Sequence, residues 1–216
     1  MKGIDQNILI FKLKISNPAI DMDEDLQKAI EFHGHMCLGL AIGYRVAKYV
    51  REHYGKAEDE ELVAIVDNNS CSVDAIQQML SCTFGKGNLI FKDYGKQAFT
   101  FYSRGNNKAL RIYFKGGIPT RMGQLQEKLS RSQLTKEEQK ELEGLREQLF
   151  QYMLNAPDND LLSIEEVDIP APEMARIYPS LKCEECGENF MEIKGRTACG
   201  EVVCKECFEK LTGKSD

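Results

Sequence analysis

FHGHMCLGLAIGYR, residues 32–45, places two of the chain's three histidines one residue apart, with a cysteine two residues further on. Three glycines interrupt what is otherwise the apolar pattern of an amphipathic helix. Imidazole and thiol side chains are ligands that transition metals such as zinc prefer. The stretch therefore indicates either a helix start that carries a few polar residues or a functional site.

A helix is expected from about residue 37 to 53, because apolar residues recur along one face and Gly55 supplies a stop. An earlier helix is expected over residues 21–33, with acids in its first turn. Gly39 and Gly43 lie four residues apart on the later helix and leave one side bare. That bare side allows close backbone packing, or admits a ligand or a second copy of the chain.

The remaining pattern predicts an α+β fold with a mixed or antiparallel sheet packed against helices. A short buried strand is expected at residues 62–66, and further strands are expected at 89–92, 97–103, 109–115 and 161–167. The turn RGNN joins two of these strands as a hairpin, and Thr135 with Glu138 forms a capping-box signature inside a helical hairpin over residues 122–151.

Composition limits the class of protein. The chain has 216 residues, 42% of them hydrophobic and 29% charged, which suits a folded protein. No run approaches the roughly 18 apolar residues of a membrane span, and the N-terminus lacks signal-peptide features, so a cytoplasmic location without membrane contact is expected. The eight cysteines are then metal ligands or thiols rather than disulfides.

Charge argues against nucleic acid as a partner, since the net charge is −6. Residues 94–126 contain six bases and no acid. This segment is either a solvated sheet face or a surface for an anionic ligand or partner.

Two Cys-x-x-Cys pairs near the C-terminus predict a structural zinc site of four thiolates, Cys183, Cys186, Cys204 and Cys207. A segment this short cannot build a stable core alone, so the metal would supply its folding energy. A proline-rich stretch precedes it, which predicts a core domain at 1–170, a linker at 171–180, and a treble-clef or zinc-ribbon domain at 181–216. Cys199 competes as a fifth thiol, but the paired motifs are favoured as ligands.

A second cluster of polar residues follows the strand at 62–66, where Cys71 and Asp74 open a helix that Cys82 closes. The loop GKGN lacks the Walker spacing, although its Lys86 is a cation that an anion would contact. At a helix N-terminus beside an imidazole, Cys37 is expected as the thiolate.

Three stretches, FHGHMCLGLAIGYR, CSVDAIQQMLSCTFGKGNL and KDYGKQAFTFY, resemble the FmdE family of formylmethanofuran dehydrogenase proteins. Some members of that family add a C-terminal treble-clef zinc finger, which the tail here resembles. The resemblance implies an α+β core, usually dimeric, with a metal or active site. Carried onto this chain, that site comprises His33, His35, Cys37, Cys71 and Asp74, with Gln77, Cys82 and Lys86 nearby. The family usually has proline where this chain has Leu38.

The leading hypothesis is a metal-binding accessory protein of molybdenum- or tungsten-linked one-carbon redox metabolism, with dehydrogenase subunits or another protein as partner. His33, His35, Cys37 and Cys71 are its candidate core metal ligands. Cys37 would be ligand or nucleophile, His35 ligand or base, Cys71 a second thiol, and Asp74 an orienting carboxylate. Gln77 and Lys86 are candidate cofactor contacts.

The alternatives are a self-contained zinc hydrolase or transferase, and a zinc-finger interaction module on a dimeric scaffold.

Overall fold

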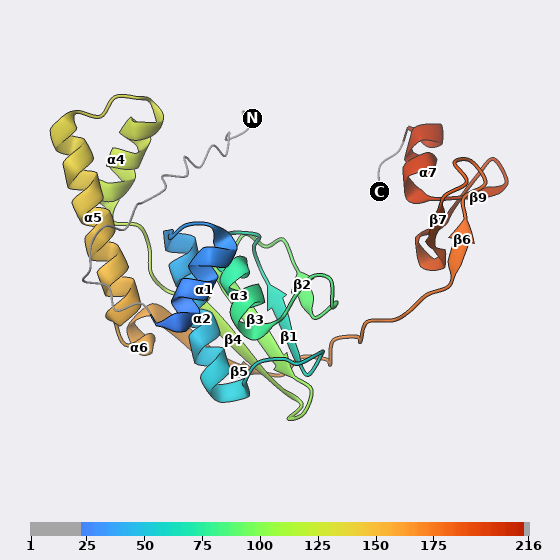
Figure 1. The fold of residues 1–216 in the computed structure, drawn as a ribbon, viewed down its shortest axis with the longest axis horizontal. Helices are drawn as coiled ribbons and strands as arrows, with labels where there is room; N and C mark the ends of the chain where they lie inside the picture. Colours follow the sequence, from blue (N-terminus) through green and yellow to red (C-terminus); the bar gives the residue numbers. More distant parts are fainter. Residues whose placement is uncertain (1–22, 214–216) are drawn as a thin grey trace. The chain divides into compact units, whose positions relative to one another are not determined.

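One mixed sheet of five strands lies in the N-terminal part of the chain (Figure 1). The computed structural model describes residues 23–213. In sheet order the strands are β2 (Leu89–Phe91), β1 (Leu62–Val66), β3 (Ala98–Ser103), β4 (Lys108–Phe114) and β5 (Leu162–Val167). β1 pairs with β2 in parallel, and every other pairing is antiparallel. The expected α+β class with a mixed sheet is therefore confirmed.

Three helices, α1 (Glu24–His33), α2 (Leu38–Tyr54) and α3 (Ser72–Leu80), cover one face of this sheet (Figure 1). Alternate residues of the strands point toward the helices and form the core with them. Phe99 and Phe101 of β3 are fully buried in the same cluster as Leu40 of α2 and Ile76 of α3. Burying such side chains is worth about 1.5–3 kcal/mol each, which holds the helices to the sheet.

The backbones of α2 and α3 touch where α2 has glycine. A Cβ atom on Gly43 would lie 2.1 Å from the carbonyl oxygen of Ser72, and one on Gly39 would lie 3.0 Å from the Cβ of Cys71. The sequence left three roles open for these glycines: close backbone packing, space for a ligand, or contact with a second copy of the chain. In the structure they allow close packing of the α2 backbone. The N-terminus of α3 is thereby fixed against the first turns of α2.

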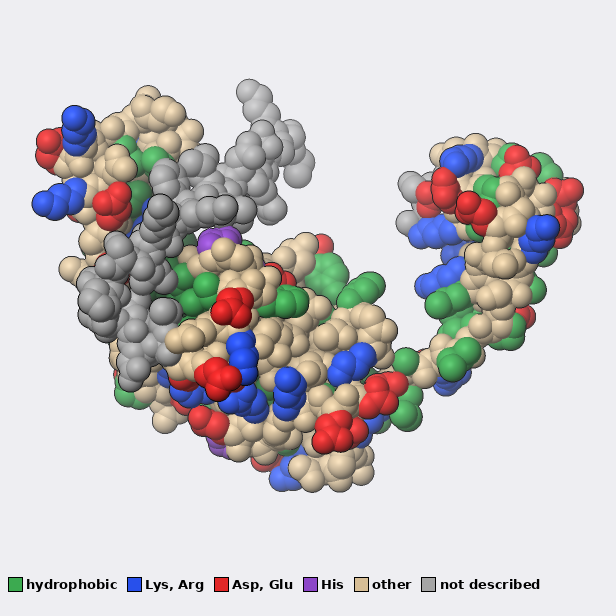
Figure 2. Space-filling view, viewed as in Figure 1, with side chains coloured by type: hydrophobic (Ala, Val, Ile, Leu, Met, Phe, Trp, Pro, Cys, Tyr) green, Lys and Arg blue, Asp and Glu red, His purple; other side chains and the backbone are tan. Residues whose placement is uncertain are grey.

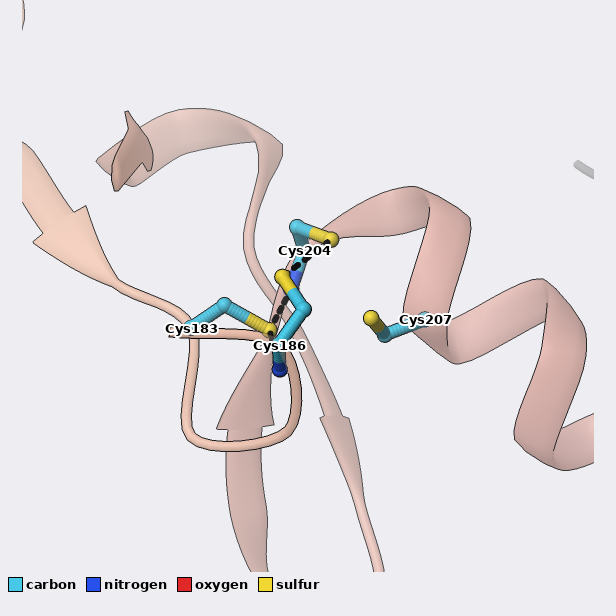
Figure 3. A group of neighbouring side chains, drawn as sticks. All are labelled: Cys183, Cys186, Cys204 and Cys207. Atoms are coloured by element: carbon cyan, nitrogen blue, oxygen red, sulfur yellow. Dashed lines mark hydrogen bonds between the residues drawn. The ribbon is translucent and has the colours of Figure 1, made fainter. Parts of the chain in front are cut away.

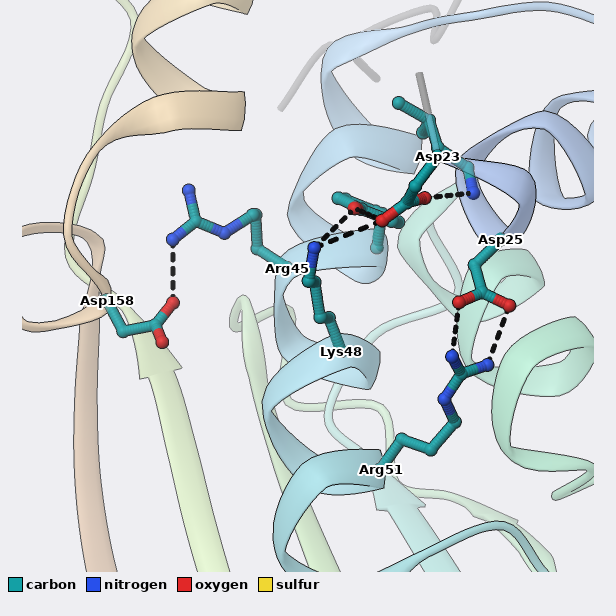
Figure 4. A network of polar contacts seen from close by, with 8 residues as sticks. Asp23, Asp25, Arg45, Lys48, Arg51 and Asp158 are labelled. Carbon is teal, nitrogen blue, oxygen red and sulfur yellow. Dashed lines mark hydrogen bonds and ion pairs between the residues drawn. The ribbon is translucent and has the colours of Figure 1, made fainter. Parts of the chain in front are cut away.

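Polar side chains hold α1 and α2 together at the start of the described chain (Figure 4). Asp23 caps α1 by accepting a hydrogen bond from the Leu26 amide at 2.9 Å, and its other oxygen accepts one from the Tyr44 hydroxyl at 2.6 Å. The expected helix start at residues 21 and 22 lies outside the described residues. At the other end, Gly34 has φ +93°, a left-handed conformation that terminates α1 and favours glycine.

A helical hairpin follows the sheet strands, made of α4 (Thr120–Ser130) and α5 (Lys136–Asn155). Its predicted capping box is confirmed, because Thr135 and Glu138 exchange side chain–backbone bonds. Met122, Leu125 and Leu142 form a small buried core between its helices. Leu38, directly after Cys37, packs against both this core and the main one.

Arg45 fastens the end of this hairpin to α2 (Figure 4). Its buried guanidinium donates to the carbonyls of Met153 and Ala156, at 2.5 and 2.7 Å, and to the carboxylate of Asp158 at 2.7 Å. These carbonyls belong to the C-terminal turn of α5, so the arginine satisfies groups that a helix end leaves without partners. Asp158 begins the short α6 (Asp158–Leu161), which leads into β5.

The chain divides into two units between Met174 and Ala175. The sequence-based expectation placed this division within a linker at 171–180. The second unit contains β6 (Ser180–Lys182), β7 (Asn189–Met191), the 3₁₀ turn η1 (Glu192–Lys194), β8 (Arg196–Ala198), β9 (Glu201–Val203) and α7 (Lys205–Thr212). Within residues 23–213, none of the helices has the length and apolar character that crossing a bilayer requires.

Replacing Gly43 by alanine should destabilise the first unit by at least about 3 kcal/mol, because the new methyl group meets backbone that cannot move without separating α2 from α3. Urea unfolding followed by circular dichroism measures the loss. Gly144→Ala is the matched control: this helical glycine has open space around its Cβ position, so the substitution should stabilise by about 0.5–1 kcal/mol. Equal effects of the two substitutions would contradict the contact.

Candidate metal centres in the core and the tail

The core centre is built at the junction between α1 and α2. His33 is the last residue of α1, and Cys37 is the N-cap of α2. Because Gly34 turns the chain at this point, the ligand atoms of His33, His35 and Cys37 all lie within 4.8 Å of one another. Two imidazole nitrogens and one sulfur at this spacing can bind a single metal ion.

Asp74 of α3 orients His33. Its carboxylate oxygen lies 2.6 Å from the Nδ1 atom of His33, while the Nε2 atom lies 3.6 Å from the Cys37 sulfur. When Nδ1–H is donated to the carboxylate, the Nε2 lone pair remains available on the side of Cys37. A carboxylate behind a histidine in this way fixes the ring and strengthens it as a metal ligand. The side chain of His33 is 11% exposed and that of Asp74 is 36% exposed, so the ring is more shielded from water than the carboxylate behind it.

The pKa of the Cys37 thiol is shifted by two opposing influences, burial and the amides at the start of α2. Its sulfur accepts a hydrogen bond from the Leu40 amide at 3.3 Å, as an N-cap should. Burial nevertheless raises the pKa of the Cys37 thiol to about 11, and the neighbouring Cys71 thiol adds to the increase. Without a bound cation, burial therefore outweighs the helix-end amides that favour the thiolate. A bound cation is what would deprotonate this thiol near neutral pH.

Cys71 lies at the N-cap of α3, next to Cys37 but outside the group of three ligand atoms. Its loop is held by Asn68, a buried residue that sequence reasoning missed. The Asn68 oxygen accepts from the amide and hydroxyl of Ser70, at 3.0 and 2.7 Å, and its nitrogen donates to the Lys96 carbonyl at 2.6 Å. The available signal was the stretch DNNS directly after a buried strand, which is typical of an Asx turn.

The other expected contacts lie elsewhere. Gln77 is on α3 one turn after Asp74 and is partly exposed. Cys82 and Lys86 follow the C-terminal end of α3. This helix is about 13 Å long, and the core centre lies at its N-terminal end. Cys82 is buried with its thiol 3.5 Å from the Leu62 carbonyl, and Lys86 donates to the Glu58 carbonyl at 3.3 Å. The structure therefore does not bring Lys86 or Cys82 to the core centre, because the helix separates them from its N-terminal residues.

The tail brings together the four predicted cysteines (Figure 3). Cys183 and Cys186 lie on the turn between β6 and β7, while Cys204 is the N-cap of α7 and Cys207 lies in its first turn. Their sulfur atoms all lie within 4.8 Å of one another. A turn and a helix that face each other across four cysteines match a treble clef, and four sulfurs fit zinc.

Backbone amides stabilise the thiolate form of one of these cysteines, which is the form that binds a cation. The Cys183 sulfur accepts hydrogen bonds from the amides of Cys186 and Cys204, at 3.5 and 3.3 Å. Burial alone would raise the pKa of the Cys183 thiol, but these amides lower it to about 6. Cys199 is exposed in the turn between β8 and β9 and is not part of the group.

Comparison with known proteins gives three similarities. The family model described as "FmdE, Molybdenum formylmethanofuran dehydrogenase operon" matches residues 32–163. A "Probable S-adenosyl-L-methionine-binding protein" of Archaeoglobus fulgidus is 30% identical over 204 residues, which are 89% of this chain and 54% of that protein. The chain thus spans about half the length of this curated relative.

The third similarity is to a crystal structure of an FmdE-like protein of the tungsten formylmethanofuran dehydrogenase type from Syntrophus aciditrophicus. The TM-score is 0.57 at 23% identity, and the match covers 87% of this chain and 91% of that one. At this identity the similarity establishes the fold.

Asp74→Asn should weaken binding of zinc at the core centre by about 10–100-fold, because the amide no longer holds His33 as a carboxylate does. Competition with a chromogenic chelator measures the affinity in the full chain with its tail loaded. Lys86→Ala is the control and should leave the affinity unchanged, since Lys86 contacts Glu58 instead. An unchanged affinity in Asp74→Asn would show that the carboxylate does not act through His33.

Cys183→Ser should remove the tail metal and unfold the second unit while the first unit keeps its stability, because the two units have separate cores. Amide NMR spectra report both units at once. Cys199→Ser should change neither unit, since Cys199 is exposed and lies outside the group of ligands. Loss of the tail's fold in Cys199→Ser would instead make Cys199 a ligand.

Proposed function

This chain belongs to the FmdE family, and from that membership we propose that it is a metal-binding accessory protein of molybdenum- or tungsten-linked one-carbon redox metabolism. The observation that carries the proposal is the convergence of His33, His35 and Cys37 on one point, with Asp74 behind His33. The family description supports dehydrogenase subunits of the same operon as partners. We also propose that the protein is cytoplasmic and forms a homodimer.

In the core centre, His33, His35 and Cys37 would hold the metal ion. A metal with three protein ligands keeps a position at which a small molecule can bind, and it supplies Lewis-acid chemistry there. The contribution of the chain is to shape this position: Gly34 turns His35 toward Cys37, and Asp74 fixes the ring of His33. We place Cys71 beside the metal ligands rather than among them.

In the tail, the four cysteines would hold a structural zinc. The cluster is closed, with four sulfurs for a tetrahedral ion, so it stabilises the second unit without offering a position for a substrate. Several large apolar side chains of this unit are exposed, among them Leu181, Met191 and Ile193. Exposed apolar surface of this kind favours a role of the tail in contact with another protein.

A self-contained hydrolase or transferase is the second candidate. It is favoured by the same three-ligand centre, because catalytic zinc sites usually have three protein ligands and an open fourth position. We do not assign S-adenosyl-L-methionine to this chain, because it spans 54% of the relative that carries that name. In addition, the loop between β1 and α3 reads DNNSC, without the glycines that let a backbone approach a nucleotide.

Cys37→Ser tests the core centre without removing the helix cap. A serine hydroxyl can accept the Leu40 hydrogen bond, so the free energy of unfolding should change by less than about 0.5 kcal/mol, whereas the thiolate ligand is lost. We expect elemental analysis to find two metal ions per wild-type chain and one in Cys37→Ser. Cys71→Ser should retain both.

One metal ion per wild-type chain, held by the tail alone, would contradict the proposal. Assays of the metal-loaded chain on formyl esters and formamides separate the two candidates. An accessory protein should show no turnover that depends on Cys37, and a hydrolase should lose its turnover in Cys37→Ser.

A further inference from the structure

Two cysteines lie where the N-termini of α2 and α3 pack against each other. Cys37 is the N-cap of α2, and Cys71 is the N-cap of α3. The missing side chain at Gly39 lets them approach, since a Cβ atom there would lie 3.0 Å from the Cβ of Cys71. The Cys37 sulfur lies 3.3 Å from the Leu40 amide, so both cysteines lie against the first turn of α2 around Gly39. Two cysteines that lie against the same helix turn are candidates for a disulfide.

This pair differs from Cys82 in its exposure to solvent, and from the cysteines of the second unit in the residues around it. Cys37 and Cys71 are both partly exposed, so a small reagent can reach them. Cys82 is fully buried against the Leu62 carbonyl, and the four tail cysteines form their own group. Cys199 is exposed in a turn of the second unit, outside both clusters. In the core, therefore, the neighbouring accessible thiols are Cys37 and Cys71.

The geometry also gives these two thiols unequal roles. Cys37 belongs to the group of three ligand atoms, and Cys71 does not. Cys71 is nevertheless held firmly beside it, because Asn68 fixes the preceding loop through its bonds to Ser70 and Lys96. The group of three ligand atoms already contains its thiol, Cys37. A thiol–disulfide pair requires a second cysteine beside it, and Cys71 is in that position.

We propose that Cys37 and Cys71 form a reversible disulfide that switches off metal binding at the core centre. The inference rests on the proposed function, because it assigns a regulation to that same centre. A sulfur in a disulfide cannot serve as a thiolate ligand, so the oxidised pair and the bound metal exclude each other. The metal in turn protects Cys37 from oxidation. The centre then binds metal under reducing conditions and releases it when disulfides accumulate.

The oxidant is a low-molecular-weight disulfide such as glutathione disulfide. The Cys37 sulfur attacks one sulfur of the oxidant, whose S–S bond breaks, and one glutathione leaves as the thiol. His33 can accept the Cys37 proton, because its Nε2 atom lies 3.6 Å from the sulfur. Cys71 then attacks the Cys37 sulfur and releases the second glutathione. Two electrons pass from the cysteine pair to the oxidant, and the two thiol protons end on the two glutathione molecules.

The experiment uses the full chain in a Cys199→Ser background, with the tail loaded with zinc and the core free of metal. Half of the sample is treated with glutathione disulfide, and both halves are titrated with Co²⁺, whose thiolate absorption reports binding. We expect the reduced protein to bind Co²⁺ and the treated protein to bind it more than about 100-fold more weakly, a larger loss than removal of an outer-shell partner causes. Dithiothreitol should restore binding, and peptide mapping should find Cys37 linked to Cys71.

Cys71→Ser is the matched control. It should bind Co²⁺ when reduced, and oxidation should stop at the mixed disulfide, with glutathione trapped on Cys37. The switch would be overturned if the protein with both Cys37 and Cys71 also stops at the mixed disulfide. It would also be overturned if these two thiols stay reduced and Co²⁺ binding is intact after treatment. Failure of the reduced protein to bind Co²⁺ would instead overturn the proposed function. Peptide mapping decides on the disulfide independently of that result.

Discussion

The core centre depends on one backbone contact, that of α2 at Gly43 with the Ser72 carbonyl of α3. Because these backbones touch, the N-terminal ends of the two helices come together on one side of the sheet. Cys37 caps one of them, Cys71 caps the other, and Asp74 lies in the first turn of the second. The bond between Asp74 and His33, and the approach of Cys71 to the first turn of α2, follow from this arrangement. Side chains larger than glycine would separate the groups that form the centre.

The two metal centres use the same residue types in different environments. In the tail, backbone amides of Cys186 and Cys204 point at the Cys183 sulfur, which lowers the pKa of that thiol. In the core, burial raises the pKa of Cys37, and two imidazoles supply the other ligand atoms. A closed set of four sulfurs suits a structural ion, while a set of three ligands keeps a position open. The core centre is therefore suited to bind a small molecule at the metal, and the tail centre is suited to stabilise the fold of the second unit.

Local sequence signals predicted the features that depend on spacing along the chain. The capping box at Thr135 and the two Cys-x-x-Cys pairs are of this kind, since their groups lie within a few residues of each other. Features that depend on packing were missed or wrong. The role of Asn68 follows from its bond to Lys96, and Lys86 was expected at a centre from which α3 separates it. The burial that raises the pKa of the Cys37 thiol could not be read from the local sequence.

The most direct test of the central claim is anomalous X-ray scattering from crystals of the full chain, grown under reducing conditions without chelator. Data collected on both sides of the metal absorption edges locate every bound ion and identify it. The account predicts one peak among the four tail cysteines and a second bounded by His33, His35 and Cys37, with Asp74 behind His33. A peak in the tail alone, in crystals whose Cys37 is reduced, would contradict it.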